Sequence, residues 1–181
     1  QLAKPALTIP IVYNTGGYET PQALALLDGA VDIYLTDLKY YASDLSKAYS
    51  NAADYFAVAS KAAALMIAQV GAPRFDADGI LQKGVIIRHL ALPGAVEDSK
   101  EILHFMAEQL PQNSFLTSVM SQYTPFYKAH EHKALRRRIS TYEYRKVVNT
   151  AVDLGLTDGF MQEKSSAKEE YTPAFDLAGV E

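Results

Sequence analysis

The chain has 181 residues, of which 49% are hydrophobic and 21% charged, with a formal net charge of −4 at pH 7. These proportions are typical of one folded domain spanning residues 1–181, and the acidic balance argues against a general nucleic-acid-binding protein. No apolar run approaches the ~18 residues of a membrane-spanning helix, so we expect no membrane segment and a cytoplasmic location. The chain contains no cysteine, which excludes disulfides and thiolate-held metal clusters built from its own residues.

The first part of the chain predicts two strands separated by a helix. Residues Leu7–Tyr13 form an apolar, β-branched run that predicts a buried strand, and residues 14–17 (Asn-Thr-Gly-Gly) supply the turn after it. Thr20 and Pro21 are a typical helix start, and Gly29 marks its end. Val31–Leu38 repeats the strand pattern.

The middle of the chain alternates between helical and extended patterns. The expected elements are a short helix from Ser43 and Asp44 to about Tyr49, an alanine-rich helix over Ala52–Gln69, a hairpin over residues 74–83, and a strand over Gly84–Leu92. The hairpin is predicted from the turn sequence Asp-Ala-Asp-Gly at residues 76–79. The strand over Gly84–Leu92 has the clearest pattern of all.

The remaining elements continue this alternation. They are a helix over Glu97–Leu110, a strand over Phe115–Met120, a helix opened by the capping box Ser140–Glu143, and a short strand over Gly159–Gln162. The strands are continuous apolar runs rather than alternating ones. The order therefore predicts an α/β fold with a mostly parallel, curved sheet, outer helices, and both sheet faces covered.

Polar side chains stand at the carboxyl ends of the predicted strands, where α/β proteins bind their ligands. They are Asn14 and Thr15 after the first strand, Asp37 and Lys39 after the second, Arg88 on the third, and Gln122 and Tyr123 after the fourth. Asp37 and Lys39 are two residues apart and so point to the same face. They could bind a zwitterionic or hydroxylated ligand, or they could form a structural salt bridge.

Three other groups have competing interpretations. Arg88, within an apolar strand, could clamp a carboxylate or phosphate, or could form an internal ion pair. His89 points the other way and is interpreted as a structural histidine. His130 and His132 are poorly spaced for a metal on a helix, so the basic run around them is interpreted as a solvated face or a contact with an acidic partner.

Four segments at these strand ends together resemble a known family. They are Ile11–Tyr18 (IVYNTGGY), Val31–Lys39 (VDIYLTDLK), Val85–Gly94 (VIIRHLALPG) and Met120–Pro125 (MSQYTP). In order and spacing they resemble the third to sixth strands of radical S-adenosylmethionine (SAM) activating enzymes. The group most similar is the uncharacterised iron–sulfur relatives of pyruvate formate-lyase-activating enzyme. The resemblance implies a partial (β/α) radical SAM barrel.

The resemblance also implies roles for individual residues. Asn14 and Thr15 match a family Asp-Thr pair near the SAM methionine and a monovalent cation, with Asn here in place of Asp. Asp37 matches a residue near the SAM ribose, and Lys39 one that meets the SAM carboxylate. Arg88 faces the same cavity. Gln122 falls near a family histidine that contacts SAM, and this sequence has no histidine there.

The family's cluster-binding motif, Cys-x3-Cys-x2-Cys, is absent from this sequence. We therefore expect a fragment carrying the SAM-facing strand ends of a radical SAM oxidoreductase, without the 4Fe-4S-binding part and inactive alone. The parent would act on a glycyl radical enzyme or another protein, and exposed sheet edges could allow self-association. The alternatives are a Schiff-base enzyme of aldolase type using Lys39, or a non-catalytic α/β binding module.

Overall fold

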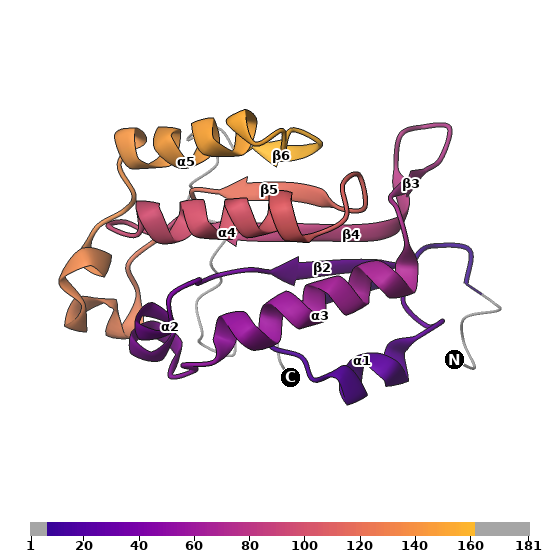
Figure 1. Cartoon of the computed structure of the whole chain (residues 1–181), viewed down its shortest axis with the longest axis horizontal. Helices are drawn as coiled ribbons and strands as arrows, with labels where there is room; N and C mark the ends of the chain where they lie inside the picture. Colours follow the sequence, from indigo (N-terminus) through magenta and orange to yellow (C-terminus); the bar gives the residue numbers. More distant parts are fainter. Residues whose placement is uncertain (1–6, 162–181) are drawn as a thin grey trace, which may run out of the picture.

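The computed structural model describes residues 7–161, which build a curved parallel sheet (Figure 1). The parallel strands, in their order across the sheet, are β1 (Val12–Thr15), β2 (Ile33–Asp37), β4 (Leu81–Leu90), β5 (Leu116–Met120) and β6 (Gly159–Met161). Strand β3 (Arg74–Phe75) runs antiparallel to the start of β4 and forms the predicted hairpin with it. The α/β class and the mostly parallel sheet predicted from the sequence are confirmed.

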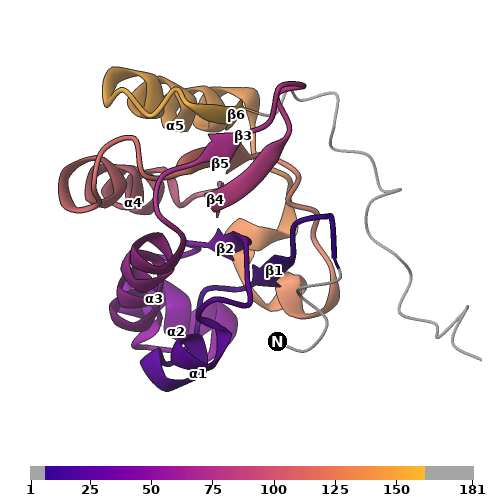
Figure 2. The same ribbon diagram turned by 90° about the vertical axis from the view of Figure 1, so that its right-hand side faces the viewer.

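Helices connect consecutive parallel strands of the sheet. They are α1 (Pro21–Leu27), α2 (Ser43–Ser50), α3 (Tyr55–Val70), α4 (Val96–Gln109) and α5 (Thr141–Asp153), and short 3-10 turns η2 (Tyr127–Glu131) and η3 (Lys133–Arg136) precede α5. The α-helices lie on one side of the arc of strands (Figure 2). Within residues 7–161, none of the helices combines the length and apolarity needed to cross a membrane.

The two faces of the sheet have different environments. On β4, the side chains of Val85, Ile87 and His89 are buried against the helices, whereas Ile86 and Arg88 point to the other face and are partly exposed. The prediction that both faces are covered is therefore wrong for the described residues, because helices cover only one of them. Apolar side chains on the second face produced the continuous runs, as they would in a barrel whose interior is filled by side chains.

The local signals at the helix ends are largely confirmed. The Thr20 side chain accepts a hydrogen bond from the amide of Ala23 at the start of α1, and Ser140 and Glu143 form a complete capping box on α5. Helix α2 differs, because Ala42 occupies its cap position and Ser43 is its first residue. No side chain at the cap position or within α2 caps that helix.

The first strand is shorter and later than predicted. It covers Val12–Thr15 rather than Leu7–Tyr13, and Leu7, Ile9 and Val12 are exposed. Strand β1 pairs only with β2, so within the described residues its outer edge has no neighbour, and β6 is the opposite edge of the sheet. An apolar run at an edge is not necessarily buried, which explains the error. Pairing with another copy through these edges stays a prediction.

Glu143 ties helix α5 to the loop after β4 and to the basic segment before α5. Its Oε1 accepts hydrogen bonds from the amide of Gly94 (2.9 Å) and from Arg137 (2.7 Å). Its Oε2 accepts from Arg137 (2.7 Å) and from the hydroxyl of Ser140 (2.7 Å). The Arg137 guanidinium, with help from Ser140 and Gly94, holds the pKa of this carboxyl well below its ordinary value of 4.5.

We therefore expect an acid-sensitive contribution to stability from Glu143. Because its folded-state pKa is depressed, the contribution is complete above pH ~4.5 and is lost as the pH falls below that value. Glu143→Gln should lower the free energy of unfolding by about 1 kcal/mol at pH 7. Urea unfolding should show a smaller variant–wild-type difference at pH 3 than at pH 7. Glu97→Gln, on the exposed first turn of α4, is the matched control and should show neither effect.

Candidate functional site

The carboxyl ends of β1, β2 and β4 bring four of the predicted side chains together. Asp37 and Arg88 are direct partners across the β2–β4 pairing, so their side chains share one face. Asn14 lies on the neighbouring strand β1, paired with Leu35 on that same face. Lys39 follows β2 by two residues. This is the helix-free face, at the edge where α/β proteins bind ligands.

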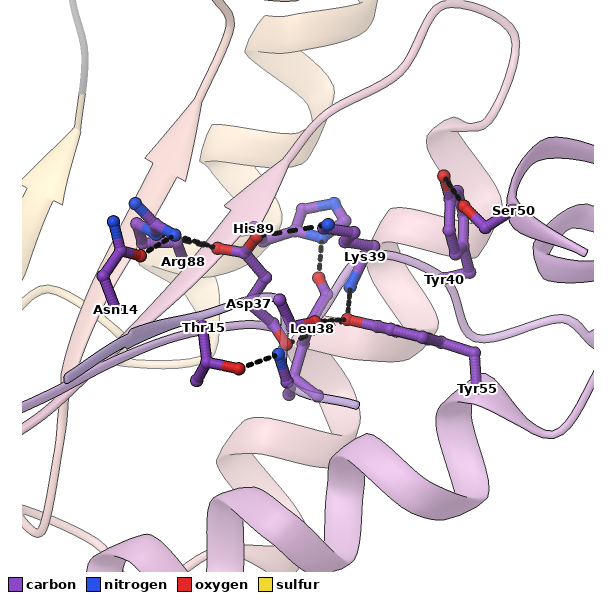
Figure 3. Close-up of polar contacts among 12 residues, drawn as sticks. Asn14, Thr15, Asp37, Leu38, Lys39, Tyr40, Ser50, Tyr55, Arg88 and His89 are labelled. Carbon is purple, nitrogen blue, oxygen red and sulfur yellow. Dashed lines mark hydrogen bonds and ion pairs between the residues drawn. The ribbon is translucent and has the colours of Figure 1, made fainter. Parts of the chain in front are cut away.

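Asp37 is the centre of a polar network on this face (Figure 3). Its Oδ1 accepts a hydrogen bond from Nε of Arg88 at 2.7 Å and forms an ion pair with Nη2 of the same side chain, also at 2.7 Å. Its Oδ2 lies 3.5 Å from the Lys39 ammonium. Arg88 also donates from Nη2 to the Asn14 side-chain oxygen at 2.9 Å. The internal ion pair that was one interpretation of Arg88 is therefore present.

A cavity of about 290 Å³ opens beside this network. Asp37, Lys39, Arg88 and Gln122 supply its polar lining, and apolar side chains of β4 and β5 supply the rest. The side chains are 14% exposed for Asp37, 23% for Arg88 and 42% for Lys39. Two cations against one carboxylate leave a local charge of +1, so the cavity favours a ligand with a carboxylate or another anionic group.

The loop that carries Lys39 is held by Tyr55 at the start of α3. The Tyr55 hydroxyl lies 2.8 Å from the carbonyl of Gly16 and 3.0 Å from that of Asp37, and it accepts a hydrogen bond from the amide of Lys39 at 3.2 Å. Burial raises the pKa of this hydroxyl, so it stays protonated and can donate. One side chain therefore joins the loops after β1 and β2.

Asp98 on α4 holds the same loop from the other end. Its carboxylate accepts hydrogen bonds from the amides of Tyr41 (3.0 Å) and Ala42 (2.7 Å), just before α2. Asp98 thus serves as the capping group that α2 lacks in its own sequence. The backbone around Lys39 is fixed by contacts with α3 and α4, both distant in sequence.

Gly17 allows the loop after β1 to lie directly against the end of β2. Its φ is 85°, and a Cβ at this position would lie 2.2 Å from the carbonyl oxygen of Asp37. A Cβ on the neighbouring Gly16 would lie 3.3 Å from the Lys39 Nζ. The two glycines therefore permit a close approach of this loop to Asp37 and Lys39.

Thr15 lies apart from this network. It follows Asn14 on β1, so its side chain points to the opposite, helix-covered side. Its hydroxyl donates to Glu19 at 2.6 Å and accepts from the amide of Gly17 at 3.2 Å. The structure gives Thr15 a role in shaping the loop and brings only Asn14 of the predicted pair into the polar network, through Arg88.

His89 is a buried structural residue, as its position on the strand indicates. Its Nδ1 lies 2.8 Å from the carbonyl of Leu38, and its side chain is almost fully buried on the helix side. Burial lowers the pKa of the imidazole, which favours the neutral form with Nδ1–H as donor. His89 thus supports the end of β2 from behind the site.

The histidines of the basic segment are separated. His130 contacts the carbonyl of Tyr127, whereas the His132 ring lies 4.9 Å from that of Tyr49 on α2. Within residues 7–161, no group of three or more histidine, aspartate or glutamate side chains is arranged to hold a metal ion.

Comparison with known proteins finds similarity both by sequence and by structure. No protein-family model matches the chain. An uncharacterised protein of Methanocaldococcus jannaschii is 32% identical over 149 residues, which are 82% of this chain and 39% of that protein. The chain thus spans about two fifths of the length of this curated relative.

The structural match is a domain of pyruvate-formate lyase-activating enzyme from Bacteroides vulgatus. It superposes with a TM-score of 0.58, covering 84% of this chain and 80% of that domain, at 15% sequence identity. This chain has the fold of that domain. In this activating-enzyme fold, the Asp37 network occupies the carboxyl edge of the parallel strands. Because the sequence identity is low, the match establishes the fold only, and the function has to be argued from the residues of the site.

Sequence reasoning missed Tyr55 and Asp98, which position the Lys39 loop in this activating-enzyme fold. Tyr55 opens an alanine-rich helix and looks like a packing residue, and Asp98 looks like an ordinary first-turn acid. Their partners are backbone groups 16 to 57 residues away. A periodic pattern carries no information on contacts of that kind.

Proposed function

We propose that this chain supplies the SAM-facing strand ends of a radical SAM enzyme that resembles pyruvate formate-lyase-activating enzyme. The observation that carries the proposal is the convergence of Asp37, Lys39 and Arg88 on one cavity, with Asn14 bonded to Arg88 in the same network. The fold of an activating-enzyme domain supports it. So does the order of the four strand-end segments along the chain.

The chemistry of the cavity fits the amino-acid half of SAM. The Lys39 ammonium is 42% exposed and borders the cavity, so it can pair with the ligand's carboxylate. Asp37 Oδ2, which Lys39 approaches only to 3.5 Å, can accept from a ribose hydroxyl or from the ligand's ammonium. Arg88 fixes the Asp37 carboxylate from the other side through a hydrogen bond and an ion pair.

The residues of this chain do not fit a 4Fe-4S cluster, because such clusters are held by cysteine thiolates and the chain has none. In this proposal the thiolates belong to residues outside the chain. The greater length of the Methanocaldococcus jannaschii relative is consistent with such residues. No part of the cluster chemistry is assigned to this chain.

The part played by this chain is to bind and orient. In radical SAM enzymes, SAM supplies a deoxyadenosyl radical that abstracts hydrogen from the substrate. Asp37 and Lys39 would fix the amino-acid and ribose groups, and Tyr55 would keep the Lys39 loop in place. The substrate of the parent would be a glycyl radical enzyme or another protein.

Calorimetric titration of the 181-residue chain with SAM tests this proposal. We expect binding, and Lys39→Gln should weaken it about tenfold because a charge pair with the carboxylate is lost. The same variant should bind methylthioadenosine, which has no amino-acid group, as well as wild type does. Lys61→Gln on the outer helix α3 is the matched control. An equal loss for both ligands would contradict the proposed Lys39 contact, and no SAM binding by wild type would favour a non-catalytic module.

The geometry does not favour Lys39 as a Schiff-base nucleophile. Such lysines are activated by a desolvated pocket or by a neighbouring cation that disfavours the ammonium. Lys39 is instead 42% exposed and lies 3.5 Å from a carboxylate. Borohydride treatment with a panel of aldehydes and ketones should therefore trap no adduct on Lys39, and an adduct would revive the aldolase hypothesis.

A further inference from the structure

A groove of about 720 Å³ lies between α2 and the η2–η3 segment, beside the ligand cavity. Both hollows include Lys39 and Tyr40 in their lining, so they are adjacent. One wall contains Lys47 and Tyr49 of α2, and the other contains residues of η2. Contacts of Tyr49 with His132 and of Tyr123 with the Leu135 carbonyl hold the walls in place.

Two adjacent aromatic residues of this groove are presented to solvent. Phe126 is 55% exposed and Tyr127 is 86% exposed. Tyr127 also has a φ of 49°, a left-handed conformation that is uncommon for an aromatic residue. The backbone thus holds the ring out toward solvent in an unfavourable conformation. Such local strain is characteristic of binding sites.

The charge of the groove is positive although the whole chain is negative. Lys39, Lys47 and Lys128 line it, against a single acidic residue, Glu131. The Lys128 ammonium lies 5.7 Å from the centroid of the Tyr127 ring, so cationic and aromatic groups are next to each other. A ligand that matches this lining carries carboxylates beside an apolar or aromatic side chain.

We infer that this groove binds an acidic, aromatic-containing peptide segment of a partner protein. A peptide is favoured over single-stranded nucleic acid because only three lysines border the groove, and Glu131 lies among them. A channel for nucleic acid would need a longer basic track. The inference goes beyond SAM binding, and its test does not require SAM.

Fluorescence anisotropy tests the inference with a fluorescein-labelled hexapeptide in which four glutamates flank a phenylalanine–leucine pair. The 181-residue chain should bind this peptide, and binding should weaken as salt is raised. A hexapeptide with lysines in place of the glutamates should bind at least about tenfold more weakly. Oligothymidine of matched charge is the nucleic-acid probe and should also bind more weakly than the acidic peptide.

Variants separate a docking role from a structural one. Tyr127→Gly relieves the positive φ, so the melting temperature should stay the same or rise while peptide affinity falls. The double variant Lys47→Gln, Lys128→Gln should weaken peptide binding about three- to tenfold and leave SAM binding unchanged. Lys61→Gln removes one charge on the outer helix α3 and should change neither.

Three outcomes would overturn the inference. They are equal binding of the acidic and basic peptides, tighter binding of oligothymidine, and full peptide affinity in Tyr127→Gly and the double lysine variant. Because the readout is peptide binding, a failure here is distinguishable from a failure of the SAM titration, which concerns the cavity lined by Asp37 and Arg88.

Discussion

Replacing Gly17 with alanine should lower the free energy of unfolding by more than about 3 kcal/mol, because two penalties combine. The residue has a φ of 85°, which alanine adopts only at a cost. Its new Cβ would also lie 2.2 Å from the backbone oxygen of Asp37, so the loop or the end of β2 must move. Urea unfolding at pH 7 measures the effect.

Gly29→Ala is the matched control for Gly17→Ala. Gly29 has a similar φ of 70°, but no atom lies within 4 Å of a Cβ built there. It should cost only the conformational penalty, about 1–2 kcal/mol. Gly17→Ala should in addition weaken SAM binding, because the displaced strand end carries Asp37 and Lys39. Equal losses of stability for the two variants would show that the close approach to Asp37 does not constrain the site.

Replacing Tyr55 with phenylalanine should destabilise the fold by about 2 kcal/mol, through the loss of one hydroxyl. That hydroxyl is next to the carbonyls of Gly16 and Asp37 and accepts from the amide of Lys39. Without it, partly buried backbone groups of two loops lose their partner while the ring packing is kept. We expect SAM binding to weaken with stability, because the Lys39 loop loses its attachment to α3.

Tyr18→Phe serves as the comparison for Tyr55→Phe. The Tyr18 ring stacks on that of Tyr55 at 6.1 Å, but its hydroxyl donates to Asp54 at an exposed position. Its loss should change the free energy of unfolding by less than about 0.5 kcal/mol. Unchanged stability and SAM affinity in Tyr55→Phe would show that Asp98 alone positions the Lys39 loop.

The sequence predicted the elements well where local chemistry determines them. Thr20 at the start of α1, the Ser140–Glu143 capping box and the hairpin turn are formed by residues close in sequence. The position of β1 was wrong, because burial of an apolar run depends on which strands flank it. The prediction that both faces of the sheet are covered was wrong for a similar reason. An apolar strand can have helices on its second face or can face the interior of a barrel, and its composition is the same in both cases.

The candidate site was predictable in part. Because parallel strands end at one edge of a sheet, the sequence predicts that Asn14, Asp37, Lys39 and Arg88 lie close together. The pairing of Arg88 with Asp37 depends on the register between β2 and β4. The contacts of Tyr55 and Asp98 with the Lys39 loop depend on how the helices pack. Thr15 points away because strand residues alternate, a rule that could have separated it from Asn14.

The polar network joins residues that are far apart along the chain. Asn14 and Arg88 are 74 positions apart, and Asp37 and Arg88 are 51 apart. The network can form only after β1, β2 and β4 have paired. A ligand that binds the network therefore stabilises the pairing of these three strands. Strand β1 has four residues and one edge without a neighbour among the described residues, so its backbone should open more readily than that of the central strands. A ligand bound at the network should slow hydrogen exchange in β1 more than in any central strand.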